Sequence, residues 1–309
     1  MNIYHGIDDF KPLSHAVVTS GTFDGVHLGH QKILTRIKHI AHKEEGESVL
    51  ITFWPHPRMV LYPEEDTLRL LNSFEEKAEL LKSQGIDHLV RIPFTKQFSQ
   101  LTSEQFIQQI LVEKIGTKKL VIGYDHRFGK NREGSFEHLK ANSTRYGFEV
   151  EEILRQDIDK ITVSSTKIRN ALLDGDISTS KELLGRPYSL TGRVVQGDKL
   201  GRQIGYPTAN VDIEYKYKLI PADGAYAVRV KINGDLHNGM MNIGFRPTVS
   251  GKQKTLEVHL FDFERDVYGE SITIFFHQRI REEVKFKDIE ALKSQLDQDK
   301  ALAIEILNK

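Results

Sequence analysis

The sequence predicts two domains of different fold classes. The first is an α/β domain with a Rossmann-like parallel sheet over residues 1–185, and the second is an antiparallel β-barrel with a terminal helix over residues 186–309. A chain of 309 residues is longer than one compact core usually supports. Short apolar runs alternate with helical periodicity up to about residue 185, and short β-rich runs separated by turns follow.

The elements of the first domain alternate between strand and helix. The expected strands span residues 15–19, 48–53, 88–92, 119–123 and 148–154. The expected helices span residues 74–82, 104–115 and 166–173, and a further helix after the first strand has its apolar face formed by Ile33, Leu34, Ile37, Ile40 and Ala41. Strands joined in this way form a mainly parallel sheet, and ligands bind beyond the carboxyl ends of its strands.

The second domain consists of short strands. Those expected span residues 189–196, 225–232, 256–261 and 272–276, and the turn pairs Asp223-Gly224 and Asn233-Gly234 separate them from their neighbours. Helical periodicity returns only over residues 287–308, with an apolar face formed by Ile289, Leu292, Leu296, Ala303 and Ile306. An antiparallel barrel followed by one helix is therefore the expected architecture.

The composition argues against several classes of protein. Forty-three basic residues balance 43 acidic ones, so no overall field attracts nucleic acid or an anionic membrane. The absence of cysteine excludes disulfides, thiolate nucleophiles and cysteine-bound metals. The first residues lack the pattern of a secretory signal, and no stretch approaches the ~20 apolar residues that span a bilayer. We expect a cytoplasmic protein without nucleic-acid or membrane partners; its oligomeric state is open, with a weak homo-oligomer as one option.

A glycine-rich turn after the first strand, GTFDGVHLGH at residues 21–30, is the first candidate phosphate site. Its glycines let the backbone turn tightly and approach a ligand. His27 and His30 lie three residues apart at the start of the helix, where free N–H groups and the helix dipole attract a phosphate. We expect both imidazoles to stabilise charge on an α-phosphate under attack. The alternatives are structural or surface histidines, or a metal pair without an evident third ligand.

The segment Ser164-Ser165-Thr166 with Arg169 is a second element of this site. Alone, it is typical of an ordinary helix N-cap. Together with the upstream turn, its hydroxyls, the helix N-terminus and the guanidinium form a clamp for the β- and γ-phosphates.

The second domain contains another candidate phosphate site. Gly197, Gly201 and Gly205 recur every four residues, as in a flap over phosphates, although turn glycines are the alternative. Thr208 and Asn210 place two oxygen donors on one side of an extended chain, which suits Mg²⁺ beside ATP phosphates. Glu257 is the candidate base in a strand whose alternate residues are apolar, and a carboxylate on the solvated face is its alternative.

Motifs across nearly the whole chain resemble bacterial bifunctional FAD synthetases. In the first half the HxGH and SSTxxR segments, TFWPHP at residues 52–57 and GYDHRFG at 123–129 are similar to the adenylyltransferase module, a nucleotidylyltransferase. His126 stands where that family usually has phenylalanine. In the second half GDKLGRQIGYPTAN at 197–210, NIGFRPT at 242–248, DVYG at 266–269 and RIREEVKF at 279–286 are similar to riboflavin kinase.

The resemblance implies two activities and a set of site residues. Riboflavin would be phosphorylated by ATP with Mg²⁺, and the FMN formed would be adenylylated by ATP with release of pyrophosphate. It implies catalytic roles for His27, His30, Arg169 and Glu257, flavin contacts for Asp125, Phe128 and Arg279, and metal ligation by Thr208 and Asn210. The implied ATP contacts are Gly21, Phe23, Gly29, Ser164, Ser165, Thr166, Gly197, Lys199, Gly201, Gly205 and Thr208.

Two other functions compete with this interpretation. One is a cytidylyl- or pantetheine-phosphate transferase with an unrelated barrel, which would leave riboflavin unchanged. The other is a flavin- or RNA-binding regulator on a worn-out catalytic fold. A regulator is expected to have lost at least one of the catalytic or metal-binding residues, and all of them are present.

Overall fold

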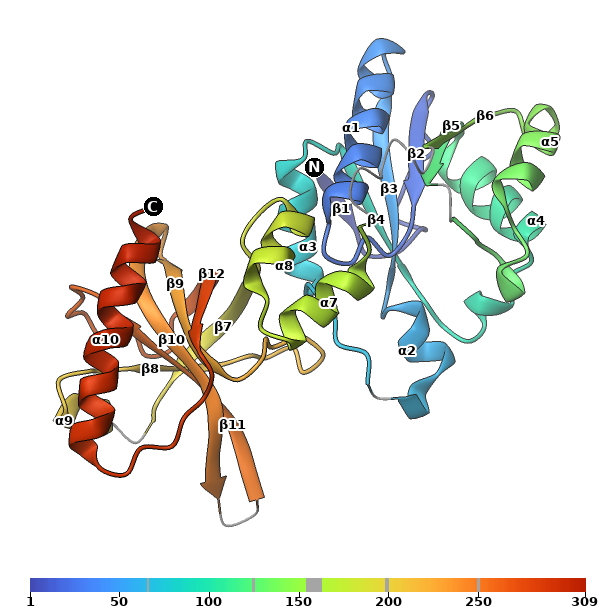
Figure 1. Cartoon of the computed structure of the whole chain (residues 1–309). Helices are drawn as coiled ribbons and strands as arrows, with labels where there is room; N and C mark the ends of the chain where they lie inside the picture. The colour runs from blue at the N-terminus through green and yellow to red at the C-terminus, as the bar shows by residue number, and fades with distance from the viewer. Residues whose placement is uncertain (66, 124–125, 154–162, 198–199, 249–250) are drawn as a thin grey trace. The chain divides into compact units, whose positions relative to one another are not determined.

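The computed structural model shown in Figure 1 describes every residue except 66, 124–125, 154–162, 198–199 and 249–250. Contacts between Cα atoms divide the chain into two compact units, Met1–Ser165 and Thr166–Lys309. Helices α7 (Ser165–Leu173) and α8 (Ile177–Leu184) thus fall almost entirely within the second unit. The Leu172 carbonyl of α7 accepts a hydrogen bond from the Ala222 N–H at 2.9 Å, and α8 contacts the barrel strand β12 (Ser271–Arg281). A functional boundary at residue 185 stays a prediction.

The first unit is built on a parallel sheet of six strands, which confirms the predicted fold class. The strands are β1 (Asn2–Tyr4), β2 (Ala16–Ser20), β3 (Glu47–Trp54), β4 (His88–Pro93), β5 (Thr117–Gly123) and β6 (Glu149–Ile153). Their order in the sheet is β1-β4-β3-β2-β5-β6, and every described pair is parallel. The central strand β2 ends at Ser20, and the glycine-rich turn begins at the next residue, at the carboxyl edge of the sheet.

Helices cover both faces of this sheet, because side chains alternate along each strand. Val17 packs with helices α1 (Leu28–Lys43) and α3 (Phe74–Ser83), whereas Val18 packs with residues of the opposite layer. That layer contains α4 (Ser103–Gln105), the π-helix η3 (Phe106–Ile115) and α5 (Phe136–Tyr146). The short elements are α2 (Pro57–Leu61), η1 (Pro63–Glu65), η2 (Phe98–Gln100) and η4 (Lys130–Arg132). Helix α5 was not predicted, since only Leu139 and Tyr146 are buried in it.

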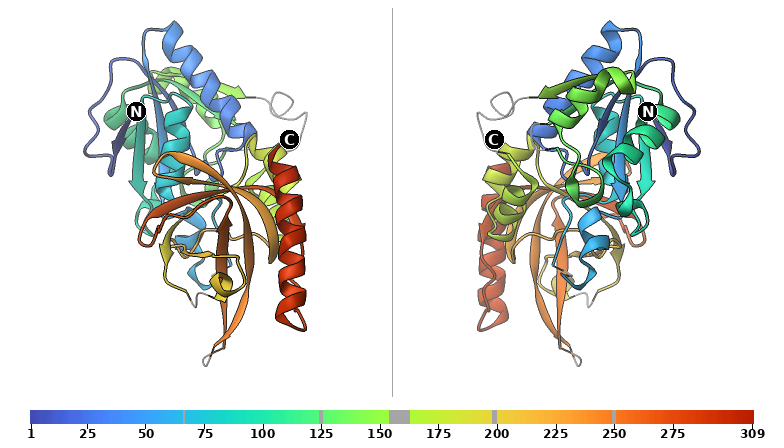
Figure 2. Two further views of the ribbon diagram at one scale, coloured as in Figure 1. Left: turned by 90° about the vertical axis from the view of Figure 1, so that its left-hand side faces the viewer. Right: turned by 90° about the vertical axis from the view of Figure 1, so that its right-hand side faces the viewer.

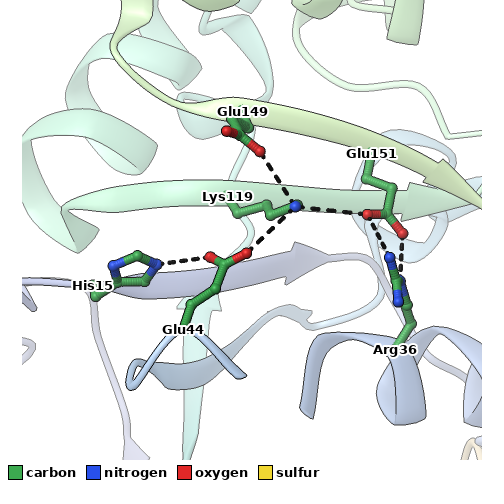
Figure 3. A network of polar contacts seen from close by, with 6 residues as sticks. All are labelled: His15, Arg36, Glu44, Lys119, Glu149 and Glu151. Carbon is green, nitrogen blue, oxygen red and sulfur yellow. Dashed lines mark hydrogen bonds and ion pairs between the residues drawn. The ribbon is translucent and has the colours of Figure 1, made fainter. Parts of the chain in front are cut away.

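A network of charged side chains connects α1 to the sheet (Figure 3). Arg36 of α1 pairs with Glu151 of β6 through two nitrogen–oxygen contacts of 2.5 and 3.0 Å. Glu44, just after α1, accepts a hydrogen bond from His15 at 2.9 Å and lies 3.6 Å from the ammonium of Lys119 on β5. The hydrogen bond from His15 lowers the pKa of Glu44. Arg36 thus ties the helix that begins with His27 and His30 to β6, and Glu44 ties its C-terminal end to β5 and to His15 just before β2.

The second unit contains a closed antiparallel barrel, as predicted. Besides β12, its strands are β7 (Ser189–Val195), β8 (Ala209–Asp212), β9 (Gly224–Ile232), β10 (Asp235–Thr248) and β11 (Gly251–Leu260), in the order β10-β11-β8-β7-β12-β9. The short helix α9 (Leu200–Gln203) lies between β7 and β8. The terminal helix α10 (Ile289–Leu307) runs along the outside of the barrel (Figure 2). The barrel core includes Tyr226 and Phe276, whose rings meet edge to face at 5.2 Å.

Candidate active sites

The glycine-rich turn forms a strained loop between β2 and α1. The Val26 N–H donates to the Phe23 carbonyl at 3.2 Å, and Gly25 between them has a φ of 84°. Phe23 and Val26 also have positive φ angles of 46° and 38°, which are rare for residues with a side chain. A Cβ on Gly21 would lie 3.1 Å from the buried Phe23 ring, a tighter contact than is usual. Backbone strain of this kind clusters at ligand-binding sites.

His27 and His30 lie together at the start of α1, as the sequence predicts. Their rings stack with centroids 3.6 Å apart and planes 13° apart, and Phe23 packs against His30 at 4.7 Å. His27 is the N-cap of the helix, where its Nδ1 accepts a hydrogen bond from the His30 N–H at 3.3 Å. Because Nδ1 is an acceptor, the proton of a neutral His27 is assigned to Nε2. That N–H and the helix N-terminus together suit an anion.

Groups that sequence reasoning missed support this loop. The buried carboxylate of Asp24 accepts hydrogen bonds from the Leu71 N–H at 3.0 Å and the Asn72 N–H at 3.4 Å. Ser165, one of the predicted ATP contacts, donates its hydroxyl to the Asp24 carbonyl at 2.9 Å. Lys77 of α3 is also buried, and its Nζ donates to the Thr22 carbonyl at 2.7 Å. Each of these partners is distant in sequence, so periodicity gives no sign of the contact.

The turn after β5 is only partly described. Asp125 lies outside the described residues, so its predicted flavin contact stays a prediction. Phe128 is partly buried against Phe106, with ring centroids 5.6 Å apart. The His126 ring stacks on Phe128 at 5.8 Å, and its Nε2 is 3.3 Å from the hydroxyl of Ser20 at the end of β2. Burial and Arg132 lower the pKa of His126 to about 4, so it is neutral at pH 7.

The other residues predicted for this site lie at the starts of α1 and α7. Ser164 directly precedes α7, and Gly29 is buried in the first turn of α1. Thr166 and the partly buried Arg169 lie in α7 and belong to the second unit. Their roles stay predictions. Among the described residues, no three His, Cys, Asp or Glu side chains are placed to hold a metal ion.

In the barrel, strand pairing brings the predicted kinase residues together. Asn210 of β8 lies directly opposite Glu257 of β11 in the antiparallel pair. The Thr208 hydroxyl donates to the Glu257 carboxylate at 3.4 Å. The pairing of β8 with β11 therefore brings Thr208 and Asn210 close to Glu257. At least 47 residues separate these two oxygen donors from that carboxylate in the sequence.

The three recurring glycines differ in what a side chain at each position would contact. A Cβ on Gly197 would lie 2.1 Å from the Asn210 Nδ2, and one on Gly201 would lie 2.1 Å from the Tyr206 carbonyl oxygen. The Gly201 carbonyl accepts the Tyr206 N–H at 2.8 Å, which closes the turn containing α9. Gly205 faces open space and has a φ of 84°. Lys199 lies outside the described residues, so its predicted ATP contact stays a prediction.

Two cavities of the barrel unit share Thr208 in their linings. One of about 280 Å³ is mostly apolar and includes Glu257, His259, Met240 and Phe286 in its lining. The other, of about 510 Å³, includes in its lining Val194, Arg202, Val258, Leu260 and the segment 263–268. Thr208 lines both. The alternation predicted for β11 is confirmed, since Glu257 and His259 face one cavity while Val258 and Leu260 face the other.

Comparisons with known proteins identify the family of this chain. Two family models match it, FAD synthetase over residues 10–167 and riboflavin kinase over residues 184–307. The bifunctional riboflavin kinase/FMN adenylyltransferase of Pseudomonas fluorescens is 40% identical over 98% of this chain and 97% of its own. The chain belongs to the bifunctional riboflavin kinase/FMN adenylyltransferase family. The relative of that name from Escherichia coli K12 is 36% identical over 99% of this chain and 97% of its own.

A solved structure extends this likeness to the whole bifunctional fold. A Streptococcus pneumoniae protein described as a macrolide-efflux protein matches with a TM-score of 0.89 and 33% identity, over 98% of each chain. That description applies to the other protein. In the part of this chain that the structure describes, no helix has the length and apolar character needed to cross a membrane.

Sequence reasoning assigned no role to several residues at the cavity of about 280 Å³. Arg281 lines it and pairs with the buried Asp299 of α10 through contacts of 2.8 to 3.1 Å. The His259 Nδ1 lies 2.8 Å from the Pro207 carbonyl, and burial lowers the pKa of His259, so a neutral ring donates there. Tyr206 donates to Asp297, and burial with that carboxylate raises the pKa of Tyr206 to about 12. The RIREEVKF motif contains Arg281 and the GDKLGRQIGYPTAN motif contains Tyr206, but neither motif indicates the acidic partners on α10.

Arg279, the predicted flavin contact, is not among the residues that line the described cavities of the kinase unit. Its guanidinium donates to the Asp223 carbonyl, and a Cβ on Gly175 would lie 2.7 Å from it. A register shift in the pairing of β12 with β9 separates Arg279 from Arg281. A flavin contact for Arg279 stays a prediction; the contacts just given are to Asp223, directly before β9, and to Gly175 between α7 and α8.

The glycine contacts give a prediction for the kinase activity. Gly197→Ala should lower riboflavin phosphorylation by about 10²-fold, because the new Cβ displaces the Asn210 amide and misplaced groups cost rate steeply. Gly234→Ala, in the turn between β9 and β10, is the matched control: its Cβ meets no atom, and its positive φ costs about 1 kcal/mol of stability. Steady-state kinase assays compare the two. Equal activity in both variants would contradict the proposed role of the Asn210 side chain.

Proposed function

We propose that the two reactions of this enzyme occur at the two sites described above. The chain phosphorylates riboflavin to FMN with ATP, and it adenylylates FMN to FAD with a second ATP. We assign the first reaction to the barrel and the second to the loop between β2 and α1. The observation that carries the kinase assignment is that Thr208 lines both cavities, one of which also contains Glu257 in its lining. Two bound substrates react only when they are held side by side, and Thr208 borders both cavities.

In the kinase site the apolar cavity suits a flavin and the second cavity suits a nucleotide. Met240 and Phe286 offer apolar contacts to a ring system, and Arg202 borders the nucleotide side. Glu257 would accept the proton of the ribityl hydroxyl while the oxygen of that hydroxyl attacks the γ-phosphorus of ATP. The bond from that phosphorus to the bridging oxygen breaks, and ADP leaves. The neutral His259 holds the Pro207 carbonyl and so places the adjoining Thr208.

The donor set of this site fits Mg²⁺. Thr208 and Asn210 supply neutral oxygens, and the Glu257 carboxylate lies opposite Asn210, and these are the hard oxygen donors that Mg²⁺ prefers. When bound there, Mg²⁺ would neutralise negative charge on the nucleotide phosphates. Thr208 and Asn210 would hold it. Divalent-metal use accompanies ATP in such domains, and the identity of the ion as Mg²⁺ is our proposal.

In the first unit the loop and the α1 N-terminus would bind the triphosphate. An oxygen of the FMN phosphate forms a bond to the α-phosphorus, and the bond to the pyrophosphate oxygen breaks. The Nε2–H of His27 and the adjoining His30 would stabilise the negative charge that develops on the α-phosphate. No side chain needs to form a covalent bond with the substrate.

One experiment tests both assignments together. The chain is incubated with riboflavin, ATP and Mg²⁺, and the flavins are separated by chromatography; FMN should appear first and FAD should follow. A parallel reaction with FMN in place of riboflavin isolates the second step, and omission of Mg²⁺ tests the metal. Riboflavin recovered unchanged would reject the kinase assignment. Location in the cytoplasm and a weak homo-oligomer stay predictions.

A further inference from the structure

A buried lysine lies beneath the loop of the adenylyltransferase site. Lys77 is 2% exposed, and its ammonium donates to the Thr22 carbonyl at 2.7 Å. The Thr52 hydroxyl is 3.5 Å from the same nitrogen, and the Trp54 ring centroid is 5.1 Å away. A charged group is rarely buried without a purpose, because removing it from water is costly. The mechanism described above makes no use of this charge.

The contact to Thr22 fixes the orientation of one peptide group. The Thr22–Phe23 peptide is trans, so its carbonyl oxygen and its N–H point in opposite directions. With the carbonyl held by Lys77, the Phe23 N–H points away from the lysine. Within the described residues, that N–H donates to no other group of the protein. The next residues, Asp24 to Val26, form the strained turn that leads into the helix carrying His27.

We propose that Lys77 is a positioning residue for adenylyl transfer, whose ammonium holds the Thr22 carbonyl so that the Phe23 N–H and the strained turn face the nucleotide phosphates. Asp24 also positions this turn. Its carboxylate fixes the turn to the Leu71 and Asn72 N–H groups, and its charge faces the ammonium. The inference rests on the proposed assignment of FMN adenylylation to this unit.

The contact between Lys77 and the Thr22 carbonyl should depend on pH, because the amine can lose its charge. Burial lowers the pKa of Lys77 to about 8, and the charge of Asp24 opposes that shift. Thr52 and Trp54 face the ammonium from β3 and carry no charge. Below pH 8 the cation holds the Thr22 carbonyl; above it the neutral amine is a weaker donor. FAD formation should therefore decrease above about pH 8, mainly through a higher KM for ATP.

Loss of folding would not explain such a decrease. An unfolded lysine titrates near 10.5, whereas folded Lys77 titrates near 8. Between these values the unfolded chain binds the proton more tightly, so the contribution of Lys77 to stability increases as the pH is raised. Activity and stability should change in opposite directions.

Three variants test the proposal, with riboflavin phosphorylation by the same molecules as the internal control. Lys77→Met should raise the KM for ATP in FAD formation about tenfold and remove the decrease above pH 8. Lys77→Arg keeps a charge at all these pH values and should restore part of the affinity without that decrease. Asp24→Asn removes the opposing charge but keeps an acceptor, and should move the decrease to lower pH.

The possible outcomes distinguish a failure of the Lys77 proposal from a failure of the proposed assignment of FMN adenylylation to the first unit. Wild-type protein that makes no FAD would reject the proposed function. Wild-type protein that makes FAD while Lys77→Met keeps the wild-type KM and pH profile would overturn the inference. Thermal unfolding at each pH shows whether a variant has lost its fold; a folded Asp24→Asn protein with an unmoved pH profile would also overturn the role of the charge.

Discussion

Glu257→Gln should reduce the formation of FMN from riboflavin by about 10² to 10⁴-fold, the range that a positioned general base supplies. The amide has nearly the same shape as the carboxylate and can still accept the hydrogen bond that Thr208 donates at 3.4 Å. It cannot accept the proton of the attacking hydroxyl. We therefore expect kcat to fall with little change in the KM for riboflavin, measured in steady-state assays that follow FMN by chromatography.

The bifunctional chain supplies the control for this variant. Conversion of added FMN to FAD should continue at the wild-type rate, because Glu257 lies in the barrel. Glu182→Gln changes an exposed carboxylate on α8 and should leave both reactions unaffected. A Glu257→Gln protein that retains more than a tenth of the kinase activity would contradict the assignment of this residue as the base.

His27→Asn should reduce FAD formation by about 10² to 10³-fold, the effect of removing one preorganised donor to a developing oxyanion. Asparagine is a favoured N-cap, so its side chain can accept the His30 N–H as the imidazole does at 3.3 Å. The substitution thus removes the Nε2–H while it keeps the start of α1. The measurement is release of pyrophosphate from ATP with FMN as the acceptor.

His27→Ala separates catalysis from helix stability. It removes the donor and the cap together, so it should lose the same activity and about 1 kcal/mol of stability in addition. Both variants should phosphorylate riboflavin at the normal rate. If His27→Asn makes FAD normally while His27→Ala does not, the residue acts as a cap and has no catalytic part.

Local patterns predicted the secondary structure where apolar residues repeat. The expected strand at 48–53 is β3, a short continuous run that is buried on both faces, and the helix at 74–82 is α3, whose apolar residues have helical spacing. Strand β10 was missed, because its sequence DLHNGMMNIGFRPT is mostly polar or glycine. It is a strand because β9 and β11 pair with it on both sides. Pairing partners of this kind are decided by the whole fold.

The sequence by itself determined the two fold classes and the glycine, histidine, threonine, asparagine and glutamate motifs, because those depend on local spacing. Only the tertiary structure decided which groups meet. The register of β8 on β11 places Asn210 opposite Glu257, and the shift in β12 separates Arg281 from Arg279. Packing of α3 under the loop brings Lys77 to Thr22 across 55 residues. Such contacts arise from the way that whole elements pack, and no local period in the chain encodes them.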